Sequence, residues 1–257
     1  MWRRIWAITS NTARETLRDR ILLAVAVFAC FLIAFSLFLG SISLEQNEKI
    51  ITDIGLAAIF LLQTFITIFA GVQLLSKEIE RKTFFLILPK PVRKVEVLVG
   101  KYVGFGIVNL FMTLLSTIVL FIILFLKAKT VMAFGPLLLA IGFGFVETML
   151  ILLVGMLFSL SVPSLLAAAL TASIFLIGHS SSLLFSVIQK QENLFLKYAL
   201  YGAYYLFPNL EKFNIRNAAA YGGSPDFAQI VLVLFYALAY GAFLFLITLH
   251  IFKRRQY

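Results

Sequence analysis

The stretch YVGFGIVNLFMTLLSTIVLFIILFL, residues 102–126, contains no charged side chain in 25 consecutive positions. A helix needs roughly 20 apolar residues to cross the hydrocarbon core of a bilayer, so this stretch predicts a transmembrane helix. Five further runs have the same character, and only the third of them contains a charge, Glu147; they are residues 21–43, 54–76, 131–160, 164–188 and 227–252. The sequence therefore predicts an all-α integral membrane protein with six transmembrane helices.

The overall composition agrees with a membrane protein. The 257 residues are 61% apolar and 13% charged, whereas a soluble domain carries about 25% charged residues. The first run is not a cleaved signal peptide, because residues 1–20 are polar and amphipathic and because the run exceeds the roughly 7–15 apolar residues of such a peptide. The single cysteine, Cys30, lies in this run, so no intrachain disulfide can form.

The basic residues are distributed unevenly along the chain. If the N-terminus is cytoplasmic, 15 of the 22 lie on the cytoplasmic side, and the other seven lie outside. The positive-inside rule favours this orientation, with both termini cytoplasmic, in the inner (cytoplasmic) membrane of a cell. The net charge of +10 therefore indicates topology and contact with anionic membrane lipid, and not nucleic acid.

Residues 1–20 predict an amphipathic helix at the membrane interface. On a helical wheel Trp2, Trp6 and Thr9 fall on one side, while Arg4 and Arg18 fall on the other. Tryptophan favours the membrane interface, where its amphipathic ring lies at the level of the headgroups. This helix is either a simple anchor for the first span or an elbow that positions it.

The connections between the runs differ in length. Residues 44–53 predict a short acidic external loop, 127–130 an external turn, and 159–164 a cytoplasmic turn. The external segment 189–226 is too long for a turn and is rich in tyrosine. We expect it to form short amphipathic helices at the outer interface, broken at Pro208 and at the glycines 222–223.

The most charged part of the chain is KEIERKTFFLILPKPVRKVEVLVGK, residues 77–101, which we call the hinge. It holds seven of the 22 basic and three of the 12 acidic residues. Residues 78–88 favour a helix that ends at Pro89 and Pro91, because proline lacks a donor and disfavours a helical residue before it. Residues 77–97 thus predict a cytoplasmic helical hairpin joined to the second and third spans; the alternative is an ordinary basic loop that only fixes topology.

The hinge resembles the signature of permeases of ABC-2 type ABC transporters. The positions that match are Glu78, Glu80, Thr83, Leu86, Leu88, Pro91, Arg93, Gly100 and Lys101. The departure is Lys82, where glycine is common in the family. In the external segment, LFPNLEKFNIRN (residues 206–217) is similar to a stretch in the branch that includes permeases linked to copper-enzyme maturation and gliding motility.

The resemblance implies the permease subunit of an ATP-driven exporter. Two permeases, identical or related, would form the translocation path and assemble with two cytoplasmic ATP-binding subunits. The hinge would be the coupling helix; its implied contact residues are Glu78, Glu80, Arg81, Lys82, Phe84, Leu88, Pro91 and Arg93. ATP and Mg²⁺ would bind to the partner, because VGKY at 99–102 lacks the upstream glycine and the Ser or Thr of a phosphate-binding loop. The chain is therefore predicted to be no ATPase and to carry no cofactor of its own.

Two ionisable residues lie deep within predicted spans. Glu147 and His179 fall near the middle of adjacent spans joined by a tight turn, so a hydrogen bond between them is expected. Such residues face protein or water, because an exposed charge in hydrocarbon is costly. With Ser180 they are candidates for the lining of a transport path, and the alternative is a structural bond between helices.

The same pair raises two other classes of function. An ion-coupled secondary carrier that uses Glu147 and His179 is the alternative to the permease, although no inverted repeat is visible in the sequence. A serine hydrolase is disfavoured, because the ring of His179 points away from Ser180 on a helix and no G-x-S-x-G turn is present. No catalytic residue and no metal site are predicted.

Overall fold

A computed structural model describes residues 2–20, 22–24, 26–28, 31, 35, 47–80, 93–127, 134–191, 193–220, 223 and 225–254. These residues form helices and short connections without a strand, which confirms the all-α prediction. Most of the predicted first span, residues 81–92 of the hinge and residues 128–133 lie outside the described part.

The helices follow one another along the chain with few long connections. Their bounds are α1 Trp2–Leu17, α3 Asn47–Phe65, the π-helix η1 Ile66–Gly71, α4 Val72–Glu80, α6 Lys94–Lys127, α7 Phe134–Ser159, α8 Ser164–His179, α9 Ser181–Lys190, α10 Leu194–Leu206, the 3₁₀-helix η2 Leu210–Phe213, α11 Arg216–Ala220 and α12 Phe227–Arg254.

Four helices of the described part are long and apolar enough to cross a membrane. They are Lys49–Ile79, Lys94–Leu126, Phe134–Ser159 and Phe227–Arg254, and α8 with α9 adds a fifth if that bent pair is one span. These helices correspond to the second, third, fourth and sixth runs of the sequence. The total of six spans stays a prediction, because the first run lies largely outside the described residues.

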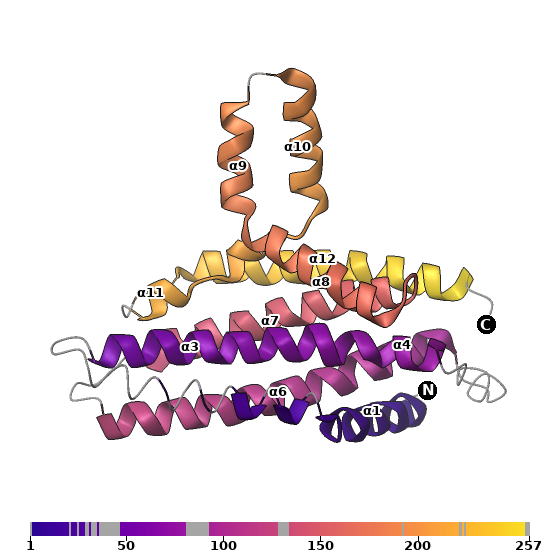
Figure 1. Ribbon diagram of the computed structural model, residues 1–257, viewed down its shortest axis with the longest axis horizontal. Coiled ribbons are helices and arrows are strands. Elements are labelled where there is room, and N and C mark those ends of the chain that lie inside the picture. The colour runs from indigo at the N-terminus through magenta and orange to yellow at the C-terminus, as the bar shows by residue number, and fades with distance from the viewer. Residues whose placement is uncertain are drawn as a thin grey trace.

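Helix α7 is at the centre of the bundle. It packs against α3, α4, α6, α8, α11 and α12, and its buried side chains contribute to each of the larger apolar clusters of the core. Figure 1 shows the long helices running in one general direction. Helix α1, the end of α4 and the end of α12 lie together at one end of the bundle, and α11 lies toward the other.

Helix α3 begins earlier than the sequence predicted. Residues 44–53 were expected to form an external loop, but α3 is helical from Asn47. Ile51 and Thr52 are buried, and Ile51 belongs to an apolar cluster with Leu120 of α6 and Leu137 of α7. This burial extends the helix beyond the charge-free run that was used to locate its start.

The fifth predicted span is not one straight helix. Residues 164–188 were expected to be continuous, but α8 and α9 are bent by 62° at Ser180. Leu210 of η2 is fully buried beside Gly178, where an added Cβ atom would lie 2.6 Å from the Leu210 Cγ atom. Segment η2–α11 thus packs along α7 beyond the end of α8, and α9 turns away from the bundle.

The N-terminal helix α1 packs along the first half of α6. Its buried residues are Thr9, Thr12 and Thr16, and the Thr9 hydroxyl donates a hydrogen bond to the carbonyl oxygen of Gly100 at 3.2 Å. Both tryptophans are exposed. The helical wheel placed Thr9 on the tryptophan side, and this was wrong for Thr9: its side chain faces α6, and the tryptophans point away from the protein.

Candidate functional site

The two ionisable residues predicted to meet inside the bundle do so. The Nε2 atom of His179, at the end of α8, lies 2.6 Å from the Oε1 atom of Glu147 in α7. The Glu147 side chain is 1% exposed and that of His179 is 17% exposed. Glu147 lies 13 residues after Phe134 and 12 before Ser159, so the pair is near the middle of the central helix.

Close packing of α7 on α3 determines how deeply Glu147 is buried. A Cβ atom at Gly144 would lie 3.0 Å from the Gln63 Oε1 atom of α3, so this glycine permits the approach of the two helices. Gly142 was expected to have the same role, but no atom lies within 4 Å of a Cβ atom there. The close approach therefore depends on Gly144 alone of these two.

The pair belongs to a larger group of charged and aromatic side chains. Glu211 of η2, which is 39% exposed, places its Oε2 atom 3.6 Å from the His179 Nδ1 atom. The Arg216 guanidinium of α11 lies 4.0 Å from the centre of the Phe60 ring, and the same ring contacts the edge of His179. Burial lowers the pKa of the Arg216 guanidinium, while the carboxylates of Glu147 and Glu211 oppose that shift. We call Glu147, His179, Glu211 and Arg216 the central charged cluster.

Ser180 has a different position from the one predicted. It is exposed and lies at the bend between α8 and α9, where its backbone N–H donates to the Leu176 carbonyl at 3.0 Å. The neighbouring Ser181 is the serine with a polar partner across the bend, since its hydroxyl donates to the Asn209 Oδ1 atom at 2.8 Å. Neither bond involves His179, which gives no support to a serine nucleophile.

A second polar region joins α3, α6 and α7, and the sequence reasoning missed it. The Gln63 amide donates to the Thr113 hydroxyl at 2.9 Å, and the Asn109 amide donates to the Thr148 hydroxyl at 3.1 Å. All four side chains are buried. Polar residues within charge-free runs were the available indication, because such groups in a membrane bond across helices. Thr148 follows Glu147 directly, so this polar seam adjoins the central charged cluster.

The hinge residues that the structure describes are engaged within the protein. The Lys101 Nζ atom lies 2.9 Å from the Glu78 Oε1 atom and donates to the Leu74 carbonyl at 2.5 Å. The Lys101 side chain is 4% exposed and that of Glu78 is 20% exposed. The pair ties the end of α4 to the beginning of α6, directly below the hairpin of the hinge.

The remaining predicted contact residues of the hinge are only partly described. Arg93 is exposed, and its backbone N–H donates to the Glu96 carboxylate at 3.0 Å at the start of α6, as in a capping box. Glu80 ends α4, and only its backbone is described. The other predicted contacts lie outside the described residues; they are Arg81, Lys82, Phe84, Leu88 and Pro91.

Two further contacts hold the same end of the bundle together. Lys77 forms a 2.8 Å ion pair with Asp19, just after α1. The Lys94 Nζ atom donates to the carbonyl oxygen of Phe252 at 3.1 Å, at the C-terminal end of α12, where a cation is favoured by the helix dipole. The chain on both sides of the hinge is thus attached to α1 and to α12.

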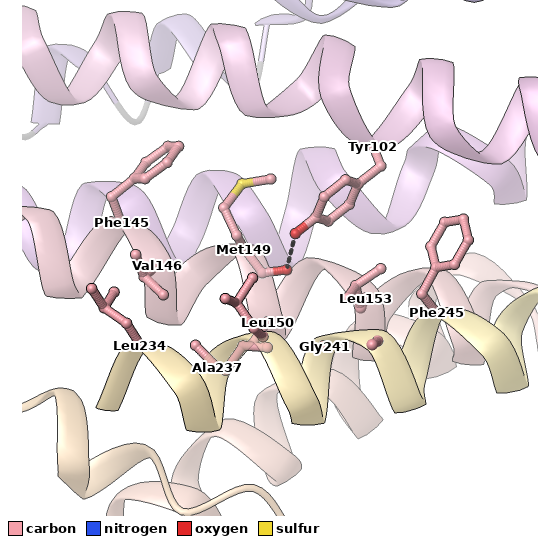
Figure 2. A pocket seen from close by; sticks show the side chains of 12 residues that line it. Tyr102, Phe145, Val146, Met149, Leu150, Leu153, Leu234, Ala237, Gly241 and Phe245 are labelled. Atoms are coloured by element: carbon pink, nitrogen blue, oxygen red, sulfur yellow. Dashed lines mark hydrogen bonds between the residues drawn. The ribbon is translucent and has the colours of Figure 1, made fainter. Parts of the chain in front are cut away.

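An apolar pocket of about 600 Å³ lies between α6, α7 and α12. Figure 2 shows Tyr102 entering it from α6, with Met149 and Leu153 of α7 and Phe245 of α12 around it. The Tyr102 hydroxyl lies 3.5 Å from the Met149 carbonyl oxygen, the hydrogen bond drawn in the figure. The lining is almost wholly hydrocarbon, so the pocket suits an apolar group and not an ion.

Within the described residues no group of three or more His, Cys, Asp or Glu side chains could hold a metal ion. Together the long apolar helices and the central charged cluster define a polytopic helical membrane protein with ionisable groups enclosed in its bundle.

Comparison with known families identifies the class more closely. A sequence model described as ABC-2 family transporter protein matches residues 6–257. The chain therefore belongs to the ABC-2 transporter family, which the hinge motif predicted. Permeases of this family are not themselves ATPases and typically work with an ATP-binding subunit. No curated protein matches the chain.

Proposed function

We propose that this protein is the permease subunit of an ATP-driven exporter in the inner membrane, with both termini cytoplasmic. Two permeases, identical or related, form the translocation path, and two separate cytoplasmic subunits bind ATP and Mg²⁺. The observation that carries this proposal is the family match over residues 6–257. The similarity of residues 206–217 to the copper-enzyme and gliding-motility branch is a narrower prediction and is not needed for it.

The hinge is proposed to transmit force from the ATP-binding subunit to the spans. Support comes from the 2.9 Å pair of Lys101 with Glu78, since it attaches α4 and α6 to each other at the base of the hairpin. Movement of the hairpin would then displace both spans together. Because the Glu78 carboxylate is directed at Lys101, we assign it to this junction, and we assign docking to Glu80, Arg81, Lys82, Phe84, Leu88, Pro91 and Arg93.

The central charged cluster and the polar seam are proposed to line the translocation path. The 2.6 Å contact of Glu147 with His179 also favours the alternative of an ion-coupled carrier, in which the pair would exchange protons with the path. The family match favours the ATP-driven permease over that carrier. In the permease, the pair holds α7 against the end of α8 at the depth where the fifth span bends.

The hinge is tested by replacing Phe84 and Leu88 together with Ala. If both side chains are anchors in the contact, the affinity for the ATP-binding subunit falls on the order of a hundredfold, measured by co-purification from membranes. Glu147→Gln is the matched control, because it lies in the bundle and should leave this binding intact. Unchanged binding in the double variant would reduce the hinge to a topological loop.

A further inference from the structure

Helices α9 and α10 form a hairpin that leaves the rest of the molecule. Figure 1 shows it projecting sideways from the bundle, across the direction of the long helices. Helix α10 has no buried residue, although it is 13 residues long. In a compact membrane protein such a hairpin is expected to be covered by something outside the chain.

The base of the hairpin is firmly attached. Ser181 donates to the Asn209 side chain at 2.8 Å, and the Asn209 backbone N–H donates to the Tyr236 hydroxyl at 2.8 Å. The Tyr240 hydroxyl donates to the Leu206 carbonyl at 2.8 Å. Both ends of the hairpin are thus bonded to each other or to α12, so its direction is set by the fold.

The sides of the hairpin are apolar and large enough for a stable contact. Six large apolar or aromatic side chains are each at least 67% exposed: Leu183, Leu194, Phe195, Tyr198, Tyr205 and Leu206. Side chains of this size expose together on the order of 800 Å², which equals the roughly 800 Å² that each partner buries in a standard protein interface.

The tip and the base of the hairpin are polar, and this argues against a covering of lipid alone. Lys190 is exposed next to the turn at residues 191–193, and the base adjoins Glu211, which is 39% exposed. The base lies beside His179, near the middle of α7. Charged tips and non-helical backbone at that depth are favourable only against protein or water.

We propose that the hairpin packs against the α9–α10 hairpin of a second copy of this chain. The two hairpins lie side by side in opposite directions about a two-fold axis, so that each basic tip reaches the acidic base of the other. The six apolar side chains are buried between them. This inference rests on the proposed dimeric permease and specifies which surface joins its two halves.

The geometry is tested by cysteine cross-linking in membranes, with Cys30 replaced by Ser. Ser186→Cys and Gly202→Cys place thiols midway along α9 and α10, where opposed hairpins cross. Gly142→Cys is the matched control, because neither glycine has an atom within 4 Å of a built Cβ atom, so neither substitution disturbs the fold. Copper–phenanthroline oxidation should give at least roughly tenfold more covalent dimer from Gly202→Cys than from Gly142→Cys, because docking raises the effective thiol concentration.

The dimer itself is measured separately, from the mass of the purified complex with the ATP-binding subunits. Covalent dimer from the hairpin cysteines but not from Gly142→Cys supports the proposed contact. If the complex contains two copies and the hairpin cysteines do not cross-link, the hairpin faces lipid and this inference is wrong, while the proposed function stands. Cross-linking through Gly142→Cys alone would likewise overturn it, since the exposed side of α7 would then join the copies.

Discussion

The Glu147–His179 pair is the residue-level feature on which the interior of this protein depends most. Its two members come from helices that are adjacent in sequence, and the 2.6 Å contact gives each a partner away from water. A buried polar group that loses its partner costs roughly 1–3 kcal/mol. The pair is therefore expected to affect stability whether or not it also contacts cargo.

A double-mutant cycle measures this pair directly. Glu147→Met and His179→Phe preserve approximate size and remove the hydrogen-bonding atoms, and each is expected to lower the stability in detergent by roughly 1–3 kcal/mol. The double variant should lose less than the sum, with a coupling of about 0.6–1.7 kcal/mol, as for polar pairs between membrane helices. Strictly additive losses in thermal unfolding would show that the contact does not form.

Lys101 is the second residue whose charge is held inside the protein. Lys101→Met keeps the length of the side chain but leaves the Glu78 carboxylate and the Leu74 carbonyl without the ammonium group. We expect a loss of about 1–3 kcal/mol and weaker stimulation of the partner's ATP hydrolysis, with binding of the partner retained. Adding Glu78→Gln removes the uncompensated carboxylate and should recover part of the stability; no recovery would mean that the pair is not formed.

At the scale of elements, helix α1 is seated on α6 through glycines. A Cβ atom at Gly104 would lie 2.7 Å from the Thr9 carbonyl oxygen and 2.8 Å from the Thr12 Cβ atom. The first neighbour is backbone, so it cannot move away without shifting α1. The exposed tryptophans of α1 then remain available for the membrane interface.

Gly104→Ala is accordingly expected to destabilise the protein by roughly 1–3 kcal/mol, the usual cost of overpacking. Gly142→Ala is the matched control, since nothing lies within 4 Å of its Cβ atom and alanine favours a helix by about 1 kcal/mol over glycine. Unfolding temperatures in the same detergent compare the two. A destabilised Gly142→Ala, or an unaffected Gly104→Ala, would contradict the packing of α1 on α6.

The elements that hydropathy alone determines were predictable, and those that depend on competition between segments were not. Uninterrupted apolar runs located α6, α7 and α12, because crossing a bilayer requires length and composition. The same criterion failed at residues 164–188, since it cannot register that η2 packs beside Gly178 and takes the place of a continued helix. Helix α3 began early for a similar reason, because burial of Ile51 is a property of the packed bundle.

The candidate site divides in the same way. Glu147 and His179 could be paired from sequence because their depths are similar and their helices are joined by a tight turn. The Gln63–Thr113 bond could not, because the two residues lie 50 positions apart and nothing in either run indicates which helix faces which. Glu78 was assigned outward from its charge, but Lys101 lies within reach and binds it.

For the whole molecule, one end of the bundle is where force from a partner would enter. There α4 and α6 are joined by Lys101 and Glu78, α1 is attached through the Lys77–Asp19 pair, and α12 through Lys94. An external push on the hairpin of the hinge would therefore reach several spans at once. This arrangement suits a subunit that does not bind ATP itself and is driven by one that does.

ATP hydrolysis by the purified chain, alone and with its ATP-binding subunit, tests that claim most directly. The account predicts no steady hydrolysis by the chain alone, co-purification of a partner with a phosphate-binding loop, and hydrolysis by the complex that a Lys101→Met permease stimulates less than the wild type. Steady ATP turnover by the isolated chain, free of contaminating ATPase, would contradict it.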